Sequence, residues 1–471
     1  MNSSALADRA TRWLIVERYR VLLVLAMLLA GAATTRAAEQ VPPPLPVRPI
    51  PSRAQLQWQK NELAMFVHFT VNTFTDREWG TGKENPEVFQ PTDLSTDQWA
   101  RVAQECGFRT IILTAKHHDG FCLWPTAYTD HSVESSAWRD GNGDVVGALA
   151  NSCREHGVDL GLYLSPWDRH EPTYGRQRYN EFYVAQVREL LDRYGPVREF
   201  WADGAKGEDA EDMTYQAEIW WDVVHQESPG ALCAILGPDI RWVGNEEGVA
   251  PTELWSTEDG TWRPAETDTS IRPGWFWHPD EDPKSVQELV DIYFKSVGRN
   301  SKLLLNVPPN REGRLAEEDV ERLRTWRSVL DKIFDKDLAS GGTAQAGSVW
   351  GGSDAFGPAQ VLDGELGTYW AAARGQTDGR VIVRLPEEAS VNVISLQEPI
   401  QMGQRVAGYH VDVHVDGGWK TVAEGTTIGY KRLHRIETAS IDRLRLVVEE
   451  TRDDNLPLIA EIGAYMDPRR D

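Results

Sequence analysis

The chain has 471 residues, of which 41% are hydrophobic, 9% aromatic and 26% charged, and this composition excludes a disordered, collagen-like or polytopic membrane protein. Lys and Arg total 49 against 72 Asp and Glu, which gives a formal net charge of -23 at pH 7. Because no cluster of basic residues interrupts this acidic balance, nucleic acid and anionic membranes are poor candidate partners. The 19 Trp residues are a hint of sugar binding only, since core packing accounts for most Trp in any protein.

The first forty residues differ in kind from the rest. Basic residues precede an apolar run over residues 21–33, and Thr35-Arg36-Ala37 supplies a small-x-Ala cleavage site. This pattern predicts a secretory signal peptide over residues 1–38 and therefore a secreted or periplasmic protein, with no membrane association after cleavage. A run of 13 apolar residues is too short to span about 30 Å of hydrocarbon as a transmembrane helix.

A Pro-rich linker, residues 39–54, leads into a region that alternates apolar strand-like runs with amphipathic helices. The predicted strands are Ala64–Phe69, Thr110–Ala115, Asp159–Ser165, Arg198–Ala202, Ala231–Leu236, Glu253–Ser256, Gly274–Trp277 and Lys302–Val307. The predicted helices are Thr96–Cys106, Asp144–His156, Arg176–Tyr194, Met213–Gln226, Ser285–Val297 and Glu317–Ile333. Near-continuous apolar runs are typical of strands buried on both faces of a parallel sheet. The alternation predicts a (β/α)8, TIM-like barrel over residues 55–336, irregular over residues 237–273, where helix signals are weak.

A second kind of pattern follows, with short alternating segments, Gly and Asp turns and no convincing helix. It predicts a C-terminal β-sandwich over residues 343–467. The expected strands include Gly379–Leu385, Val391–Leu396, Gly408–Val415, Trp419–Ala423 and Leu444–Val448. The segment 359–364, followed by Thr368-Tyr369-Trp370, resembles the discoidin-like, galactose-binding sandwiches appended to secreted glycosidases. Such a module either binds sugar or buttresses the barrel, and we favour the buttress because a fold does not by itself carry a binding site.

The four cysteines are Cys106, Cys122, Cys153 and Cys233. They form no CxxC pair and no metal-ligand spacing, so neither a zinc site nor a thioredoxin-like motif is expected. We expect buried thiols, because a free Cys inside a helix or strand behaves as a small hydrophobe, although export would permit a disulfide. No metal and no cofactor is predicted.

Polar and aromatic side chains stand at the ends of the first four predicted strands, where a barrel carries its catalytic residues. These strand ends are His68, Lys116-His117-His118-Asp119-Gly120, Tyr163 followed by Trp167 and Asp168, and Trp201-Ala202-Asp203-Gly204. One such residue is commonly a helix cap or a partner of a backbone group. Four adjacent strands that all end in this way indicate an active site.

Asp203 is the sharpest of these candidates, because it is a lone carboxylate at the end of an apolar strand and is followed by Gly204, which permits a sharp turn. It is interpreted as a nucleophile or base, with the N-cap of a following helix as the alternative. Glycoside hydrolysis needs a second carboxyl group, about 5 to 5.5 Å away in a retaining enzyme. Glu246 and Glu247 lie on a Gly-flanked loop after the fifth strand, and spacing alone does not choose between them.

Several ordered motifs carry a resemblance to a known family. They are Val67-His68-Phe69, Glu78-Trp79-Gly80, Lys116-His117-His118-Asp119-Gly120-Phe121 with Trp124-Pro125-Thr126, Tyr163-Leu164-Ser165 and Phe200-Trp201-Ala202-Asp203-Gly204. Together they resemble the α-L-fucosidases of glycoside hydrolase family 29, over roughly residues 55–334. The resemblance implies a retaining exo-glycosidase that removes terminal α-L-fucose from a fucosylated oligosaccharide or glycoconjugate through a covalent fucosyl-enzyme.

By the same resemblance Asp203 is the catalytic nucleophile. The residues that line the fucose pocket are His68, Glu78, Trp79, His117, His118, Tyr163 and Trp201. Imidazoles and a carboxylate can hold sugar hydroxyls, and Trp79 or Trp201 can pack on the apolar C5-methyl side of fucose.

The segment Arg241-Trp242-Val243-Gly244-Asn245-Glu246 is similar to the subfamily that prefers α-1,3- and α-1,4-linked fucose on branched glycans. In that subfamily the Glu directly after Gly-Asn is the acid/base, which implies Glu246 rather than Glu247. An arginine that helps to hold fucose in other members has no clear match, so Arg241 stays unassigned.

Two other classes of function stay open at the level of the residues. A metal-dependent hydrolase could use His117, His118, Asp119 and Asp203 as ligands, but no HxH pair closes the first strand, and adjacent histidines on a strand point to opposite faces. A non-catalytic sugar-binding protein is the other alternative, and the presence of both candidate carboxylates argues against it.

Overall fold

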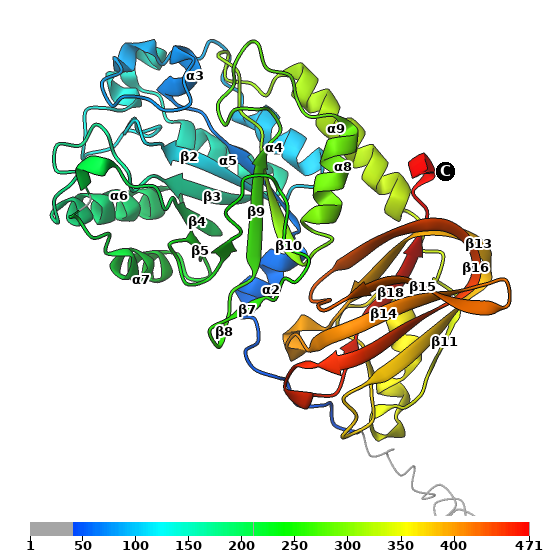
Figure 1. The fold of residues 1–471 in the computed structure, drawn as a ribbon. Coiled ribbons are helices and arrows are strands. Elements are labelled where there is room, and N and C mark those ends of the chain that lie inside the picture. The colour runs from blue at the N-terminus through cyan, green and yellow to red at the C-terminus, as the bar shows by residue number, and fades with distance from the viewer. Residues whose placement is uncertain (1–40, 211, 471) are drawn as a thin grey trace, which may run out of the picture. The chain divides into compact units, whose positions relative to one another are not determined.

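Eight parallel strands form the first sheet, in the order β5-β4-β3-β2-β1-β10-β9-β6 (Figure 1). They are β1 (Leu63–Val67), β2 (Thr110–Lys116), β3 (Asp159–Leu164), β4 (Glu199–Ala202), β5 (Leu232–Ile235), β6 (Arg241–Trp242), β9 (Ala265–Ser270) and β10 (Ser301–Asn306). Strand β1, the first in the chain, pairs with β2 on one side and with β10, the last strand of the barrel, on the other. No ladder joins β5 to β6 in the described residues. The sheet is therefore a nearly closed barrel, which confirms the predicted fold class. This computed structural model describes residues 41–210 and 212–470, so the predicted signal peptide lies outside the described residues.

Six helices lie outside the strands (Figure 1). They are α4 (Thr96–Glu105), α5 (Val145–His156), α6 (Tyr179–Tyr194), α7 (Ala217–Glu227), α8 (Val286–Lys295) and α9 (Glu317–Phe334). The signals in α5 illustrate why they form, since the Asp144 side chain accepts the Gly147 N–H at the start and Gly157 ends the helix at φ +65°. All six predicted helices are confirmed within a few residues.

Two shorter helices, α2 (Arg53–Lys60) and α3 (Val71–Thr75), were not predicted. Helix α2 begins inside the predicted linker, where Ser52 and Gln55 form a capping box. A capping box satisfies two otherwise unpaired N–H groups and so starts a helix that is too short to show a clear apolar period.

Two predicted strands were wrong. Residues 253–256 and 274–277 are not strands, and the corresponding places in the barrel are taken by β6 and by β9. The sequence of β9 is Ala-Glu-Thr-Asp-Thr-Ser, and all six residues are buried. Strand β9 contains no apolar run, because its inward side chains are carboxyl groups whose hydrogen-bond partners lie elsewhere in the barrel. Over residues 237–273 the structure has no helix and instead forms the hairpin β7 (Thr257–Glu258) and β8 (Thr261–Trp262), which confirms the predicted irregularity.

The C-terminal region is an antiparallel β domain. Its main sheet runs β11-β13-β16-β14-β15, and β18 pairs with β13. These strands are β11 (Thr343–Ala346), β13 (Gly379–Gln397), β14 (Val406–Val415), β15 (Gly418–Gly425), β16 (Arg432–Thr451) and β18 (Glu461–Tyr465), and β12 (Trp370–Ala371) pairs with β17 (Leu458–Ile459). Two predicted strands are joined in β13, because register shifts bend the β13–β16 ladder without ending it.

The barrel and this β domain share specific contacts. Glu62 forms an ion pair with Lys431, and the Asn300 side chain accepts the Tyr430 N–H at 2.8 Å. The Asn300 N–H in turn donates to the Lys431 carbonyl at 2.9 Å. These bonds attach the β domain to the barrel.

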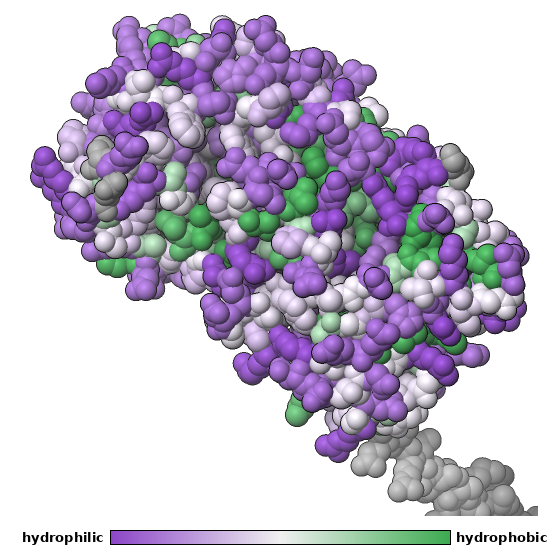
Figure 2. Space-filling view, in the orientation of Figure 1, coloured by the Kyte–Doolittle hydropathy of each residue, from purple (hydrophilic) through white to green (hydrophobic). Residues whose placement is uncertain are grey.

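The surface carries few apolar side chains. Figure 2 shows that this face of the molecule is largely hydrophilic, with hydrophobic residues in separate patches. No helix among residues 41–210 and 212–470 is long and apolar enough to cross a membrane. Trp79, at 62% exposure, is one of the few large apolar side chains that are exposed in the described chain, and its place at the candidate site explains why.

Candidate active site

One cavity of about 340 Å³ opens at the carboxyl ends of the barrel strands. All nine candidate site residues line it: His68, Glu78, Trp79, His117, His118, Tyr163, Trp201, Asp203 and Glu246. The barrel brings them together because neighbouring parallel strands end at the same rim. His68 directly follows β1, His117 directly follows β2, and Asp203 directly follows β4.

Asp203 is held in place by two hydrogen bonds. The Tyr163 hydroxyl donates to Asp203 Oδ2 at 3.0 Å, and the Ala205 N–H donates to Oδ1 at 2.7 Å. His118 Nε2 lies 3.9 Å from Oδ2. The next α-helix begins only at Ala217, so Asp203 does not cap a following α-helix. The carboxylate is 29% exposed and is oriented toward the cavity that it lines.

Hydrogen bonds define the tautomers of two pocket histidines. The Ser165 hydroxyl donates to the Trp167 carbonyl at 2.6 Å, so its oxygen accepts the Nδ1–H of His118 at 2.6 Å. The Asn306 amide nitrogen donates to Ser270 and to a backbone carbonyl, so the Asn306 Oδ1 accepts the Nδ1–H of His68 at 2.8 Å. In both neutral rings the proton is therefore on Nδ1, and Nε2 is left as an acceptor.

Burial keeps the three pocket histidines neutral. The pKa of His68 is lowered to about 3 by burial and, to a smaller extent, by the nearby His118, against the opposing effect of the Asn306 bond. Burial likewise lowers the pKa of His118 to about 4 despite the opposing attraction of Asp203. The pKa of His117 falls well below its ordinary value, through burial and then through His118 and His68. Neutral imidazoles can both donate to and accept from sugar hydroxyls.

The expectation that His117 and His118 point to opposite faces was wrong. Both rings line the cavity, with their centroids 4.1 Å apart. Strand β2 ends at Lys116, and its register with β3 shifts between Thr114 and Lys116. The alternation of side chains holds only within a strand, so it does not apply to these two residues.

The neutral histidines predict a stability that falls in acid. A histidine of the unfolded chain binds a proton with a pKa near 6.5, whereas His68 of the folded protein has a pKa of about 3. The contribution of neutral His68 to the free energy of unfolding is therefore fully present above pH 6.5 and is lost as the pH falls toward 3. Between pH 7 and pH 5, His68 should lower the free energy of unfolding by about 2 kcal/mol. Denaturant unfolding at the two pH values should show a smaller loss for His68→Gln than for wild type, and equal losses would contradict the assignment.

Glu78 joins two loops at the rim. Its carboxylate accepts the N–H groups of Trp275 at 2.8 Å and Phe276 at 3.0 Å, and it lies 2.8 Å from His278 Nε2. The adjacent Trp79 packs edge-on against Trp167, with ring centroids 6.1 Å apart. The loop after β1 thus closes one side of the cavity and presents an aromatic wall to solvent.

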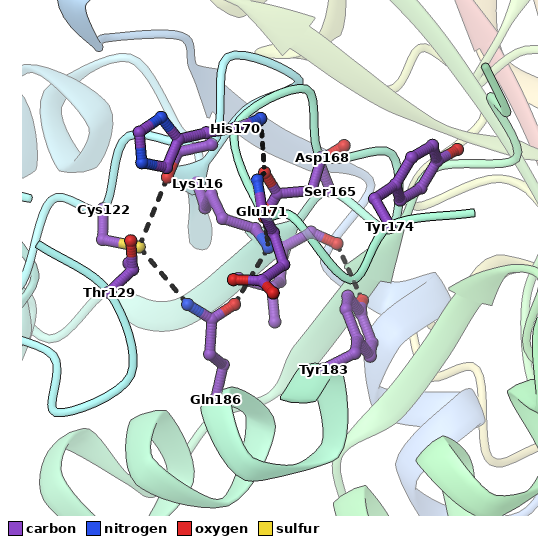
Figure 3. Close-up of polar contacts among 12 residues, drawn as sticks. Lys116, Cys122, Thr129, Ser165, Asp168, His170, Glu171, Tyr174, Tyr183 and Gln186 are labelled. Carbon is purple, nitrogen blue, oxygen red and sulfur yellow. Dashed lines mark hydrogen bonds and ion pairs between the residues drawn. The ribbon is translucent and has the colours of Figure 1, made fainter. Parts of the chain in front are cut away.

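A buried ion pair supports the loop that carries Trp167. Lys116 Nζ lies 2.8 Å from Asp168 Oδ2 and donates to Gln186 of α6 at 2.9 Å, as Figure 3 shows. Asp168 Oδ1 accepts the His170 N–H at 3.0 Å. Burial alone would raise the pKa of Asp168, but the charge and hydrogen bond of Lys116 lower it. Lys116, at the end of β2, therefore holds the loop after β3 in place.

The loop after β6 separates Glu246 from Glu247. Both residues are exposed, but Glu246 lines the cavity and Glu247 does not. Glu246 has a φ of +54°, a backbone conformation that is uncommon for a residue other than glycine and is frequent at functional sites. Asn245 Oδ1 accepts the Glu247 N–H at 3.0 Å and so stabilises the turn. Arg241 donates to the Trp255 carbonyl at 2.6 Å and does not line the cavity.

Six further residues line the cavity without having been predicted as site residues: Phe66, Ala205, Ile235, Trp242, Asp268 and Trp275. Asp268 is 3% exposed. Burial raises its pKa to about 7, and the neighbouring Glu246 and Asp203 also raise it, while a hydrogen bond from Trp242 opposes the shift. The alternation of Glu266 and Asp268 in β9 was the available signal, since a period of two places both side chains on one face of a strand.

The cysteines are free and buried, which confirms the expected thiols. The structure nevertheless brings Cys233 together with His225 and Asp239, and their ligand atoms lie within 4.8 Å of one another. Spacing along the chain does not reveal this cluster, because it forms where α7 packs against β5. His225 Nε2 lies 2.8 Å from Asp239 Oδ2, which also accepts the Cys233 N–H at 2.9 Å. The polar groups of these three side chains can form hydrogen bonds with one another, and none of the three residues lines the cavity.

The barrel and the convergence of carboxylates, neutral imidazoles and indoles at its rim define a carbohydrate-active (β/α)8 enzyme. Residues 47–332 match the family model of α-L-fucosidase, and residues 343–462 match the F5/8 type C domain. The chain belongs to the α-L-fucosidase family, glycoside hydrolase family 29, and is an α-L-fucosidase. This family membership decides against the two alternatives that the residues alone left open, a metal-dependent hydrolase and a non-catalytic sugar-binding protein. The match to the F5/8 type C domain confirms the predicted discoidin-like domain.

Proteins of similar sequence or structure match this chain over nearly its whole length. An Arabidopsis thaliana protein named α-L-fucosidase 1 is 47% identical, over 90% of this chain and 89% of its own length. The crystal structure of SpGH29 is 39% identical with a TM-score of 0.86, over 90% of this chain and 100% of its own. A Ruminococcus gnavus GH29 fucosidase, solved in complex with fucose, is 32% identical with a TM-score of 0.86, over 92% of this chain and 97% of its own.

Proposed function

We propose that this α-L-fucosidase is a retaining exo-enzyme that releases terminal α-L-fucose by double displacement. Asp203 is the nucleophile and Glu246 the acid/base. The observation that carries the proposal is that both carboxyl groups line one cavity, with Asp203 positioned by the Tyr163 hydroxyl at 3.0 Å. Two carboxyl groups on one sugar-sized cavity are the minimum that a retaining glycosidase needs.

In the first step an Asp203 oxygen forms a bond to the anomeric carbon as the bond from that carbon to the glycosidic oxygen breaks. Glu246 gives its proton to the departing oxygen, which leaves as an alcohol. In the second step ionised Glu246 takes a proton from water, and the water oxygen displaces Asp203 from the anomeric carbon. Two inversions yield α-fucose and restore both carboxyl groups to their starting protonation states.

The remaining pocket residues recognise the sugar. The Nε2 atoms of His68 and His118 accept fucose hydroxyl protons, because their Nδ1–H groups are committed to Asn306 and Ser165. His117 Nδ1 is buried without a hydrogen-bond partner in the structure, and we assign it to a third sugar hydroxyl. An indole face, from Trp79 or Trp201, packs against the C5-methyl group.

We further propose that the preferred substrates carry α-1,3- or α-1,4-linked fucose on branched glycans. The support is the similarity of the segment 241–246 to that subfamily and the position of Glu246, which is exposed and lines the cavity, on the loop after β6. The predicted signal peptide supports an enzyme that acts after export, in the periplasm or outside the cell, on oligosaccharides or glycoconjugates.

Product analysis tests this proposal. Proton NMR of an aryl α-L-fucoside digest, recorded before mutarotation, should show α-fucose first, and early β-fucose would require an inverting mechanism. A panel of oligosaccharides should give a higher kcat/KM for a branched Lewis-type α-1,3/1,4 substrate than for a linear α-1,2 substrate. A clear α-1,2 preference would remove the linkage proposal and leave the retaining mechanism standing.

A further inference from the structure

Strand β9 supplies a carboxyl group to each of two tryptophans that line the cavity. The Trp201 indole N–H donates to Glu266 Oε2 at 3.0 Å, and the Trp242 indole N–H donates to Asp268 Oδ1 at 2.7 Å. The two indole rings lie edge to face, with centroids 6.5 Å apart. Strands β4 and β6, which do not pair with each other, are thus both tied to β9 through their aromatic side chains.

The loop that carries Glu246 depends on the same strand. Strand β6 pairs only with β9 in the described sheet, through residues 241–242 and 265–266. Beyond β6, the Val243 N–H donates to the Glu266 carbonyl at 2.9 Å, and the Gly248 N–H donates to the Asp268 carbonyl at 3.0 Å. Both ends of the loop are therefore fixed to β9, at the point where the barrel is not closed by β5.

Asp268 makes contacts on both sides of this loop. Its side chain holds Trp242, which precedes the loop, and its carbonyl holds Gly248, which ends it. A buried carboxyl group is costly unless its hydrogen bonds repay the desolvation, and Asp268 is 3% exposed. An apolar side chain would fill the same volume without this cost, so packing alone does not account for the carboxyl group.

We propose that Asp268 is a positioning residue for proton transfer, which holds Trp242 and the loop so that Glu246 reaches the glycosidic oxygen. The proposal rests on the proposed role of Glu246. Loss of the Trp242 bond would let the β6 end of the loop shift, and a misplaced acid would slow departure of a poor leaving group. A good leaving group needs little protonation, so its departure would be affected far less.

The test compares kcat/KM, which reports the first step alone, for a branched fucosyl oligosaccharide and for a nitrophenyl fucoside. Asp268→Ala should lower kcat/KM for the oligosaccharide by about 10- to 100-fold and kcat/KM for the aryl fucoside by less than about threefold. Asp268→Asn should restore kcat/KM for the oligosaccharide to within about fivefold of wild type, because the amide oxygen still accepts the indole N–H. Trp242→Phe removes that donor together with part of the ring, and it should reproduce the contrast of Asp268→Ala.

Thr267→Ser is the matched control. Thr267 precedes Asp268 on β9, donates through its hydroxyl to the Lys302 carbonyl, and keeps that hydroxyl when changed to Ser. It should match wild type on both substrates. Equal losses on both substrates in Asp268→Ala, or an Asp268→Asn enzyme as slow as Asp268→Ala, would overturn the positioning role. If Asp268→Ala does not fold, Trp242→Phe and Asp268→Asn decide the question by the same comparison.

The two levels of inference fail in different ways. If Glu246→Ala shows no contrast between the two substrates, the proposed acid/base is wrong, and the role of Asp268 falls with it. If Glu246→Ala shows the contrast and both Asp268→Ala and Trp242→Phe do not, the acid/base assignment stands and only the positioning role is refuted.

Discussion

Asp203→Ala is expected to lower kcat on every fucoside by at least about a thousandfold, because it removes the proposed nucleophile of the covalent intermediate. The fold should survive the change, since Asp203 is partly exposed at the rim and its partners are a tyrosine hydroxyl, a backbone N–H and a neutral imidazole. Steady-state turnover of an aryl fucoside and a thermal unfolding curve measure the two halves of this expectation.

A small anion should partly rescue the Asp203→Ala enzyme. Azide can enter the space of the missing carboxylate and attack the anomeric carbon of an activated aryl fucoside, which would release the phenol and form β-fucosyl azide. Asp212→Ala, which changes an exposed carboxylate on the same segment after β4, is the matched control and should keep wild-type turnover. Retention of more than about a tenth of wild-type activity by Asp203→Ala would remove the nucleophile assignment.

Glu246→Ala should produce the strongest dependence on the leaving group. An acid catalyst matters most when the departing oxygen is basic, so kcat/KM for a natural fucosyl oligosaccharide should fall by about a thousandfold. For a dinitrophenyl fucoside, whose phenolate departs without protonation, the loss in the first step should stay below about tenfold. The measurement is kcat/KM for both substrates in wild type and variant.

Glu247→Ala is the control for this experiment, because it removes the same kind of acidic side chain from the next residue of the same loop. Its side chain is exposed and does not line the cavity, so both substrates should be hydrolysed as by wild type. Leaving-group dependence in Glu247→Ala, and not in Glu246→Ala, would move the acid/base by one residue and contradict the geometry of the loop.

Most of the barrel could be predicted from the sequence because its strands are buried on both faces. The runs that became β1, β2 and β3 are mostly apolar, and parallel strands end at one rim, so the polar residues that follow them were expected to meet. His68, Tyr163 and Asp203 do lie on one cavity. Local signals also sufficed for α5, where a cap residue and a terminal glycine mark both ends.

The sequence by itself determined the fold class, the six outer helices and the strand ends that face the cavity, because each of these depends on local periodicity or on one shared rule of barrel geometry. Only the tertiary structure decided the identity of β6 and β9, the separation of Glu246 from Glu247, and the inclusion of Asp268 in the cavity. In the polar strand β9, indole N–H groups from β4 and β6 each donate one hydrogen bond to the buried carboxyl groups of Glu266 and Asp268. Those partners lie 65 and 26 residues away along the chain, and a pattern within one segment cannot report a hydrogen bond to a partner that only folding brings near.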